Sequence, residues 1–255
     1  MIHLNELNLF SNNIKNIEFS TKFTALTYLE IGSNSVSMIM PLSNLKKLKV
    51  IGLSENIIND IKPIQKLTTL EGLFLDHNQI IDITPLKNLI NLEYLYLSGN
   101  KIQNIGAITG LINLDALFLE NCNIMDIQPL TNLKKMKTLN LYLNNIQEIR
   151  SIAKLIELDN LNLSCNHIID IKSLENLSNL TELNLENNKI QDIRPLEKLL
   201  KLTVLYLPNN KIRSIKPLEK LINLKVLFLE NNLISDYSPI KSYYKNLEKS
   251  DFLLQ

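Results

Sequence analysis

The chain contains 255 residues, carries a net charge of +1 and is 45 % hydrophobic. This balance gives no whole-chain preference for nucleic acid or for an acidic partner, and no run of about 18 apolar residues is present that could cross a membrane. The N-terminal sequence MIHLNELNLF has no basic segment followed by an apolar block, which a secretory signal requires. We therefore expect a cytoplasmic protein, or a secreted or surface protein if the sequence has been trimmed from a longer chain.

A pattern of 22 residues repeats along the chain. Residues 70–91 read LEGLFLDHNQIIDITPLKNLIN, and their apolar residues change from a strand-like period of two to a looser spacing. The form L-x-x-L-x-L-x-x-N-x-I at this length is the leucine-rich-repeat pattern, in which each unit is one coil of a solenoid. The units begin at Leu4, Leu26, Leu48, Leu70, Leu92, Leu114, Met136, Leu158, Leu180, Leu202 and Leu224. We predict a single solenoid over residues 1–255, with eleven repeats beginning at Leu4 and a half-repeat at 247–255 that caps the last coil.

The first half of each repeat predicts a short strand. Apolar residues at the fourth and sixth positions alternate with other residues, as a strand with one buried face requires, and successive strands should stack in parallel about 4.8 Å apart. The ninth position is asparagine in ten repeats and Cys122 in the remaining one. An asparagine amide can donate and accept hydrogen bonds, so a ladder of these residues can satisfy the backbone where the chain turns inward.

The second half of each repeat predicts a short helical turn. Isoleucine fills the fourteenth position in ten of the eleven repeats, and proline follows two places later in seven. Proline begins a helical turn well but disfavours helix in the residue before it. About seven residues then remain before the next strand, which is enough for one turn of 3-10 or α-helix. The predicted fold is an α/β solenoid, a right-handed leucine-rich-repeat horseshoe with strands on its concave side and turns on its convex side.

Two segments carry a family resemblance. Residues 80–100 (IIDITPLKNLINLEYLYLSGN) and 190–210 (IQDIRPLEKLLKLTVLYLPNN) resemble the internalin type of leucine-rich repeat, whose outer segment reads D-I-x-P-L. The resemblance extends from residue 4 to about residue 243. The 22-residue SDS22-like repeats of phosphatase regulators are similar in pattern. Both resemblances imply the same fold, and they leave the partner open.

Aromatic residues gather at the variable positions of the predicted strands. Nine of the fifteen Phe and Tyr residues lie there, and the other six belong to the terminal coils. Phe74, Tyr96 and Phe118 share the fifth position in three successive coils, which predicts a stripe of rings about 5 Å apart. Tyr94 and Tyr142 should flank the stripe. Exposed aromatic clusters often mark binding surfaces, although aromatic residues also favour strands and pair across them.

Two further features accompany the stripe. Gly52 and Gly72 lie beside it in the predicted register and should leave room for a groove. A second patch, farther along the chain, contains Tyr206 and Phe228. We expect this patch to be a second anchor for the same partner.

Charge is distributed unevenly between the predicted faces. The strand positions carry twelve acidic residues and only three basic ones. An acidic, aromatic concavity repels phosphate backbones and should attract a basic or Arg-bearing protein surface. The remaining lysines are expected to be solvated on the convex side rather than to bind nucleic acid.

The sequence shows no catalytic or metal-binding pattern. His3, His77 and His167 are far apart in the repeat register, so no nucleophile and base are brought together. Cys122 and Cys165 are two coils apart, about 10 Å, which is too far for a disulfide, and their spacing matches no zinc motif. We expect neither a cofactor nor enzymatic activity.

These observations predict a monomeric, non-catalytic scaffold that binds a partner protein on its concave face. The expected contact residues are Phe74, Asp76, Tyr94, Tyr96, Phe118, Glu120 and Tyr142, with Tyr206 and Phe228 as the second anchor. Two alternatives stay open. One is an intracellular regulatory subunit that docks a phosphatase or another enzyme, and the other is the recognition segment of a larger surface or effector protein.

Overall fold

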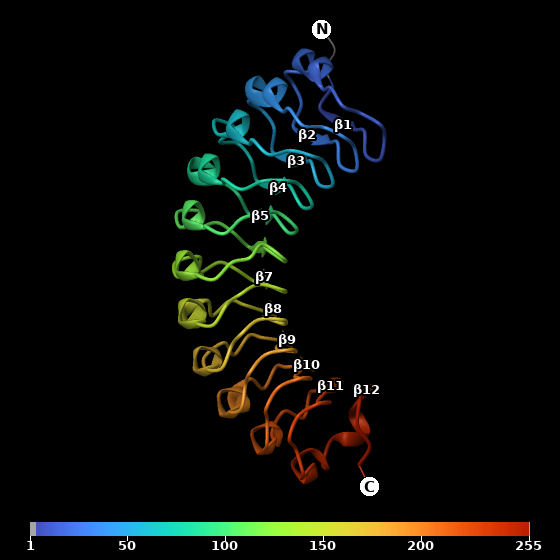
Figure 1. Ribbon diagram of the computed structural model, residues 1–255, viewed down its shortest axis with the longest axis vertical. Coiled ribbons are helices and arrows are strands. Elements are labelled where there is room, and N and C mark those ends of the chain that lie inside the picture. The colour runs from blue at the N-terminus through green and yellow to red at the C-terminus, as the bar shows by residue number, and fades with distance from the viewer. Residues whose placement is uncertain (1–3, 255) are drawn as a thin grey trace. The chain divides into compact units, whose positions relative to one another are not determined.

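The computed structural model describes residues 4–254, which fall into two compact units divided between Ile124 and Met125. Residues 1–3, including His3, and residue 255 belong to the predicted solenoid but lie outside the described residues. In each unit the strands lie on one side and short 3-10 turns on the other (Figure 1). Within residues 4–254, no helix combines the length and apolar character needed to cross a membrane.

Each repeat of the first unit contributes one three-residue strand, and short turns alternate with these strands. The strands are β1 (Glu6–Asn8), β2 (Tyr28–Glu30), β3 (Val50–Gly52), β4 (Gly72–Phe74), β5 (Tyr94–Tyr96) and β6 (Ala116–Phe118). The turns are η1 (Glu18–Lys22), η2 (Met40–Asn44), η3 (Lys62–Ile64), η4 (Thr84–Asn88) and η5 (Gly106–Ile108).

The second unit follows the same plan. Its strands are β7 (Thr138–Asn140), β8 (Asn160–Asn162), β9 (Glu182–Asn184), β10 (Val204–Tyr206), β11 (Val226–Phe228) and β12 (Lys249–Ser250). Its turns are η6 (Gln128–Leu130), η7 (Arg150–Lys154), η8 (Lys172–Leu174), η9 (Arg194–Lys198), η10 (Lys216–Leu218), η11 (Ser238–Ile240) and η12 (Tyr244–Asn246).

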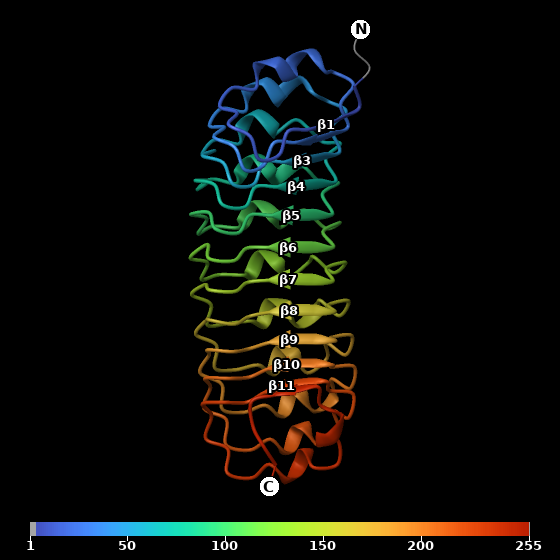
Figure 2. The same ribbon diagram turned by 90° about the vertical axis from the view of Figure 1, so that its right-hand side faces the viewer.

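The strands of each unit pair in parallel and in register with the 22-residue repeat, as Figure 2 shows for the stacked strands. Leu73 of β4 lies opposite Leu95 of β5, for example, and Leu95 lies opposite Leu117 of β6. From the second coil onward the Leu and Ile residues at the fourth and sixth positions are buried, whereas Leu7 and Leu9 of the first coil are only half-buried. The third and fifth positions face outward, as in β5. The predicted solenoid of short parallel strands and single 3-10 turns is therefore confirmed.

The asparagine ladder joins each coil to the preceding one. The side-chain amide of Asn78 donates to the carbonyl oxygens of Leu75 in its own coil and Leu53 in the coil before, at 3.0 and 2.9 Å. Its Oδ1 accepts from the backbone N–H of Ile58 at 2.9 Å. The Sγ of Cys122 lies 3.4 Å from the carbonyl oxygen of Leu97, so the thiol occupies the corresponding rung. The ladder thus satisfies backbone groups that the inward turn buries.

The eighth position has a conformation that the repeat pattern did not predict. In all eleven repeats this residue has a positive φ, between 51° and 57° for the non-glycine residues and 68° for Gly99. Glycine and asparagine enter this left-handed region most readily. The residues are Ser11, Ser33, Glu55, His77, Gly99, Asn121, Leu143, Cys165, Asn187, Asn209 and Asn231. Each coil therefore turns out of its strand at a backbone position that most side chains disfavour.

Polar side chains also begin the outer turns. The Oδ1 of Asp82 accepts from the backbone N–H of Thr84 at 2.8 Å, and Asp192 accepts from the N–H of Arg194 at 2.9 Å. These hydrogen bonds lower the pKa of both aspartates, with the Arg194 side chain contributing most at Asp192. The aspartate of the D-I-x-P-L segment is thus the residue that starts the 3-10 turn.

The residues after β11 cover the last coil. Strand β12 pairs with β11, and the carboxylate of Asp251 accepts the backbone N–H groups of Leu229 and Glu230 at 2.8 and 2.7 Å. Tyr243 fills a core position that is leucine in most repeats, and its hydroxyl donates to the Leu218 carbonyl oxygen at 2.7 Å. Asp251 therefore supplies acceptors that a further strand would otherwise provide at this edge.

Candidate functional site

The aromatic stripe, defined as Phe74, Tyr96 and Phe118, forms a continuous row of rings in the first unit. Strand register places the three residues side by side at the ends of β4, β5 and β6. The ring centroids of Phe74 and Tyr96 are 4.8 Å apart, and those of Tyr96 and Phe118 are 4.2 Å apart. The Tyr96 and Phe118 rings are stacked, with an interplanar angle of 19°. All three side chains are half-buried on the strand face rather than enclosed in the core.

The stacking decides which part of the rings is available. Because Tyr96 and Phe118 are stacked, each ring covers one face of the other, and those faces are not available to a partner. Ring edges carry the positive end of the aromatic quadrupole and pack well against apolar groups. The stripe is therefore better suited to an apolar ridge than to a cation placed over a ring face.

Tyr94 stands beside the stripe at the third position of β5. Its neighbours in the strand register are Gly72 on β4 and Ala116 on β6, which are both small. Tyr94 is 41 % exposed, more than the residues of the stripe. Its ring thus rises above its neighbours and is accessible to a partner.

The glycines beside the stripe do not leave an open groove. A Cβ atom at Gly52 would lie 1.9 Å from Oε2 of Glu30, and one at Gly72 would lie 3.3 Å from Cε2 of Phe74. The Glu30 side chain from the preceding coil therefore occupies the space above Gly52, and the Phe74 ring leans over Gly72. The glycines accommodate the protein's own side chains, so the predicted groove is wrong at these two positions.

Asp76 occupies the seventh position, just beyond Phe74, and is held by the two neighbouring coils. Its Oδ1 accepts from the backbone N–H of Ser98 at 2.9 Å, and its Oδ2 accepts from the hydroxyl of Ser54 at 3.2 Å. Burial raises the pKa of Asp76, while the hydrogen bonds from Ser98 and Ser54 oppose the shift. Within residues 4–254, no Lys or Arg forms an ion pair with this carboxylate. Asp76 thus combines an internal structural role with an unneutralised negative charge.

Glu120 occupies the same seventh position two coils later. Its backbone N–H donates to the hydroxyl of Ser98 at 3.2 Å. Burial and then the charge of Asp76 raise the pKa of the Glu120 carboxyl. Burial and Asp76 also raise the pKa of Tyr96. Asp76, Tyr96 and Glu120 therefore share one electrostatic environment at this edge of the stripe.

The stripe changes how the backbone is satisfied. In five other repeats the fifth position is polar, and its side chain accepts the N–H of the seventh residue two places later. These residues are Asn8, Glu30, Asn140, Asn162 and Asn184. An aromatic ring cannot accept this bond, and the N–H groups of Ser98 and Glu120 instead find acceptors on Asp76 and Ser98 in the preceding coils. The aromatic residues thus replace a locally stabilising group, and the neighbouring coils compensate.

In the second patch, the backbone at the seventh position is accommodated differently after each aromatic residue. Tyr206 and Phe228 hold the fifth position on β10 and β11, with ring centroids 5.3 Å apart and an interplanar angle of 22°. The seventh position of this repeat, two residues after Tyr206, is Pro208, which has no backbone N–H that needs an acceptor. After Phe228, the N–H of Glu230 donates to Asp251. The second unit therefore contains its own compact aromatic pair.

Tyr142 lies in the second unit and differs from the other aromatic residues. It holds the seventh position, is 37 % exposed and precedes the exposed Leu143, which has a φ of 57°. Its backbone N–H donates to Oδ1 of Asn140 at 3.1 Å. The expectation that Tyr142 flanks the stripe stays a prediction.

His77 packs against Gly99, which holds the same eighth position in the next coil. A Cβ atom at Gly99 would lie 2.5 Å from Nδ1 of His77, so the imidazole covers Gly99 in the next coil. Both residues have a positive φ. His77 therefore has a packing role at the edge of the stripe.

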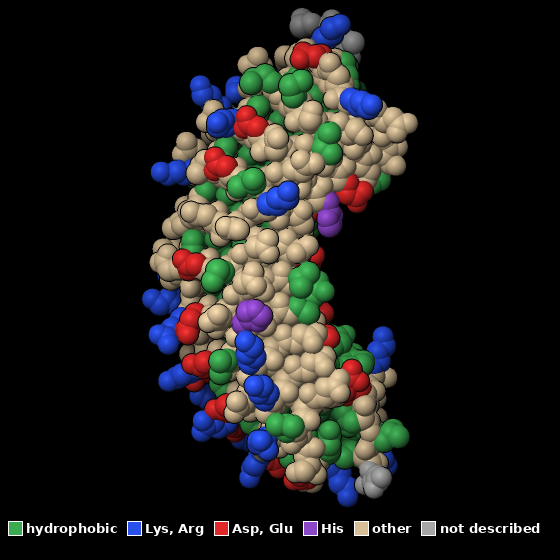
Figure 3. All heavy atoms as spheres, viewed as in Figure 1, with side chains coloured by type: hydrophobic (Ala, Val, Ile, Leu, Met, Phe, Trp, Pro, Cys, Tyr) green, Lys and Arg blue, Asp and Glu red, His purple; other side chains and the backbone are tan. Residues whose placement is uncertain are grey.

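The proportion of basic to acidic side chains differs between the strand side and the turn side of each unit. Figure 3 shows Lys and Arg side chains along the side that carries the 3-10 turns, together with acidic residues. On the strand side of the first unit, the ion pair between Lys49 and Glu71 has a distance of 2.8 Å, and both side chains are largely exposed. Glu93 is exposed in the next coil. The strand face beside the stripe is thus predominantly acidic.

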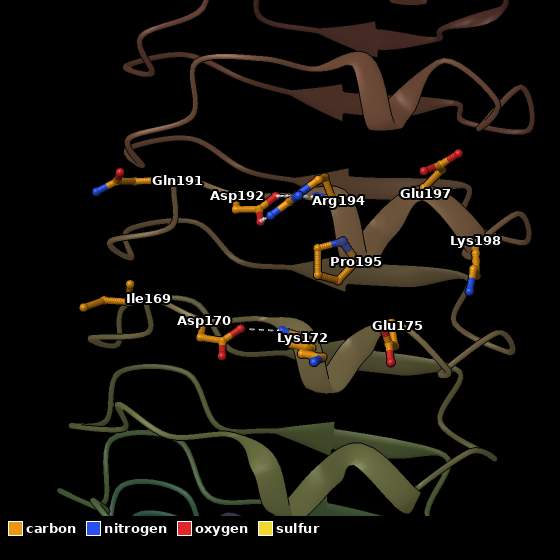
Figure 4. Close-up of a pocket in the computed structure, with 10 residues that line it drawn as sticks. All are labelled: Ile169, Asp170, Lys172, Glu175, Gln191, Asp192, Arg194, Pro195, Glu197 and Lys198. Carbon is orange, nitrogen blue, oxygen red and sulfur yellow. Dashed lines mark hydrogen bonds and ion pairs between the residues drawn. The ribbon is translucent and has the colours of Figure 1, made fainter.

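The outer side of the second unit has a hollow between η8 and η9 (Figure 4). It has a volume of about 610 Å³. Two of its carboxylates have local partners: Asp192 pairs with Arg194 at 2.6 Å, and Asp170 accepts from the backbone N–H of Lys172. These groups do not converge on a common point, so the hollow has no organised small-molecule site.

Metal and thiol chemistry have little structural basis here. In the described part of the chain, no three His, Cys, Asp or Glu side chains gather closely enough to hold a metal ion. Neither Cys122 nor Cys165 forms a disulfide. Burial raises the pKa of the Cys122 thiol to about 11, so this thiol is protonated at neutral pH.

Comparison with known families supports the repeat assignment. The family model described as Leucine Rich repeats (2 copies) matches residues 68–111, 156–198 and 200–242, slightly more than half of the chain. None of the curated proteins matches the chain.

Solved structures give the same result. An internalin of Listeria monocytogenes is 29 % identical, with 99 % of this chain and 88 % of that chain covered and a TM-score of 0.81. Internalin C2 of the same species is 35 % identical over 82 % of each chain, with a TM-score of 0.60. A leucine-rich-repeat protein of Leptospira interrogans is 31 % identical, with 98 % of this chain and 66 % of that chain covered and a TM-score of 0.90.

Proposed function

This chain belongs to the leucine-rich repeat family, with repeats of the internalin type, and from this premise we propose that it is a non-catalytic scaffold that binds a partner protein on its strand face. Solenoids of this kind typically serve as protein-interaction domains because their repeats build an extended binding surface. The proposed contacts are Tyr94 and the aromatic stripe in the first unit, with Tyr142, Tyr206 and Phe228 in the second.

The observation that carries the proposal is the fifth position of β5 and β6. Polar residues at this position in other repeats satisfy the backbone of their own coil, whereas Tyr96 and Phe118 cannot and leave this task to neighbouring coils. The rings also remain half-buried on the strand face, while the core uses Leu and Ile. A partner that covers these rings explains why aromatic residues stand where the fold accepts asparagine.

The charge of the same face favours a basic partner. Asp76 and Glu120 follow the stripe, and Glu71 and Glu93 precede it. Lys49 pairs with Glu71 at 2.8 Å, so the acidic residues of these positions outnumber the basic ones without being wholly unpaired. A complementary positive surface would be attracted at long range and would relieve the cost of the partly buried carboxylates. In this proposal Asp76 acts mainly through its charge, because both of its oxygens already accept internal hydrogen bonds.

The test is affinity capture from a cell extract with immobilised wild-type protein and two variants. The first variant is Tyr96→Ala with Phe118→Ala, which removes the stacked pair. The second is Ile90→Ala with Ile112→Ala, a matched control, because each isoleucine is 54 % exposed and lies in the turn before the same two strands. We expect a protein that the wild type and the control retain and the stripe variant loses.

Two results would count against the proposal. Equal capture by the stripe variant and the wild type would mean that the rings serve only sheet packing. Loss of capture by the isoleucine control would indicate that the partner binds near the turns that carry Ile90 and Ile112, and not on the strand face. Phosphatase activity in the captured material would identify the partner as an enzyme and the chain as its regulatory subunit.

A further inference from the structure

The arrangement of charge around the aromatic stripe has a defined width. The second position of three successive coils carries Glu71, Glu93 and Asp115, and the seventh position carries Asp76 and Glu120 with Ser98 between them. Lys49 and Lys137 hold the second position in the coils on either side, and Lys49 pairs with Glu71 at 2.8 Å. The stripe at the fifth position therefore runs between two acidic rows. With a strand rise of about 3.3 Å per residue, these rows lie about 10 Å before the stripe and about 7 Å after it.

The stripe also has a defined length. Three parallel strands about 4.8 Å apart place Phe74 and Phe118 about 10 Å from each other. Two turns of an α-helix rise about 11 Å, and a helix with its side chains is about 10–12 Å wide. An apolar ridge over two helical turns therefore matches the stripe. The two acidic rows are about 17 Å apart, so long side chains on the two sides of the same helix would extend outward toward them.

From this geometry, and resting on the proposed function, we infer that the partner segment bound by the stripe is a basic amphipathic helix lying across β4, β5 and β6. Its apolar residues, spaced at i, i+4 and i+7, would pack on the exposed parts of Phe74, Tyr96 and Phe118. Lys or Arg residues on both sides of that ridge would face the two acidic rows.

Other occupants fit the same surface less well. An extended strand in this direction alternates its side chains between the surface and solvent, so it cannot present an apolar ridge with basic residues on both sides. Nucleic acid and anionic membrane surfaces would be repelled by the acidic rows. A purely apolar helix would place no positive group beside the partly buried charge of Asp76.

The carboxylate of Asp76 is the strongest reason to expect Lys or Arg in the partner helix. It is partly buried against the stripe, its hydrogen-bond donors are neutral groups, and no Lys or Arg of the described chain pairs with it. An Arg or Lys head group placed within a few ångströms would interact with this charge in a poorly solvated setting, where attraction exceeds that at an exposed site.

The experiment is selection of a displayed library of random peptides of about sixteen residues, long enough for about four helical turns. Peptides are selected on the wild-type protein and counter-selected on the Tyr96→Ala, Phe118→Ala variant. We expect enriched sequences with helically spaced apolar residues and Lys or Arg on both sides of them. Their affinity should fall about tenfold or more on the stripe variant and remain unchanged on the Ile90→Ala, Ile112→Ala control.

Two further measurements test charge and conformation. Glu93→Gln with Glu120→Gln should weaken an enriched peptide several-fold, and raising the ionic strength from about 0.1 M to about 1 M should do the same because the Debye length shortens. Circular dichroism of the bound peptide should show helix. Enriched peptides that lack basic residues, or that bind in an extended form, would overturn the inference.

Three other outcomes of these experiments would distinguish the helix inference from the proposed function. The absence of any peptide enriched on the wild type over the stripe variant would contradict the inference, while capture of a partner by the intact face would still support the proposed function. Dimerisation that the stripe variant abolishes would assign the face to a second copy of this chain instead. Failure of both the selection and the capture experiment would remove the proposed function itself.

Discussion

The backbone N–H of Ser98 donates to Oδ1 of Asp76 at 2.9 Å, across two coils whose fifth positions are both aromatic. Asn140, Asn162 and Asn184 satisfy the equivalent N–H within their own coils. The carboxylate of Asp76 therefore replaces a bond that Tyr96 cannot make, and the acidic edge of the stripe follows partly from this structural need.

Replacing Asp76 tests this role through pH. Because burial raises the pKa of Asp76, the folded protein binds the proton more tightly than the unfolded chain. The free energy of unfolding should therefore increase as the pH falls through the raised pKa toward the ordinary value of about 3.9. In Asp76→Asn this contribution disappears, while Oδ1 can still accept from Ser98 and Nδ2 can donate to Ser54.

The comparison uses urea unfolding between about pH 4 and pH 7. We expect Asp76→Asn to be at least as stable as the wild type at neutral pH and to show a flatter pH dependence. Asp76→Ala should lose about 1–3 kcal/mol, because the N–H of Ser98 loses its acceptor. A pH dependence identical in wild type and Asp76→Asn would contradict the assignment.

Ser20 gives a stability prediction in the first coil. Its side chain is fully buried at a position that other repeats fill with Leu or Ile, and its hydroxyl has no hydrogen-bond partner within the described residues. A buried hydroxyl without a partner costs about 1–3 kcal/mol. Ser20→Ala should therefore raise the free energy of unfolding by about 1 kcal/mol, measured by urea titration against the exposed control Ser37→Ala. A loss of stability in Ser20→Ala would show that the hydroxyl is satisfied.

Leu143 tests the left-handed eighth position. Its φ is 57°, a conformation in which the Cβ of an ordinary residue is crowded, and its side chain is 44 % exposed. Leu143→Asn should raise the free energy of unfolding by about 1 kcal/mol, whereas Leu143→Ala retains the Cβ and should gain little. The reverse change at an equivalent position, Asn187→Leu, should lower thermal stability. An unchanged melting temperature in both Leu143→Asn and Asn187→Leu would argue against backbone strain at this position.

The two cysteines should differ in reactivity. Cys122 is fully buried and its pKa is raised to about 11, while Cys165 is partly exposed. Since the thiolate is the reactive form, iodoacetamide should modify Cys165 in the native protein and leave Cys122 intact until the chain is unfolded in guanidinium chloride. Mass spectrometry of tryptic peptides distinguishes the two sites. Rapid native labelling of Cys122 would mean that the asparagine ladder opens near this rung.

The repeat spacing was sufficient to predict the strands and turns because it depends on period and not on residue identity. Leu73, Leu95 and Leu117 lie where the 22-residue register placed them. The left-handed eighth position was missed because its residues vary from Ser to Glu, His, Leu and Cys, and only the asparagines hint at it. That variety conceals a backbone requirement that the coil imposes on whichever residue is present.

The surroundings of the stripe depended on contacts between coils, which the sequence does not specify. The side chain of Glu30 covers Gly52 from 22 residues away, and this filled the expected groove. The dual role of Asp76 was also hidden, because it arises only when Phe74 and Tyr96 occupy the neighbouring fifth positions. A pattern of residue types could thus place the aromatic stripe, but it could not show which acidic side chains were already engaged.

The most direct measurement is the dissociation constant of a captured partner, determined by calorimetric titration on wild type, Tyr96→Ala with Phe118→Ala, and the isoleucine control. The stripe variant should bind at least about a hundredfold more weakly, while losing only about 1–3 kcal/mol of stability from the missing ring contacts. The control should bind like the wild type. Equal affinity for all three proteins, each verified as folded by its melting curve, would contradict a binding role for the stripe.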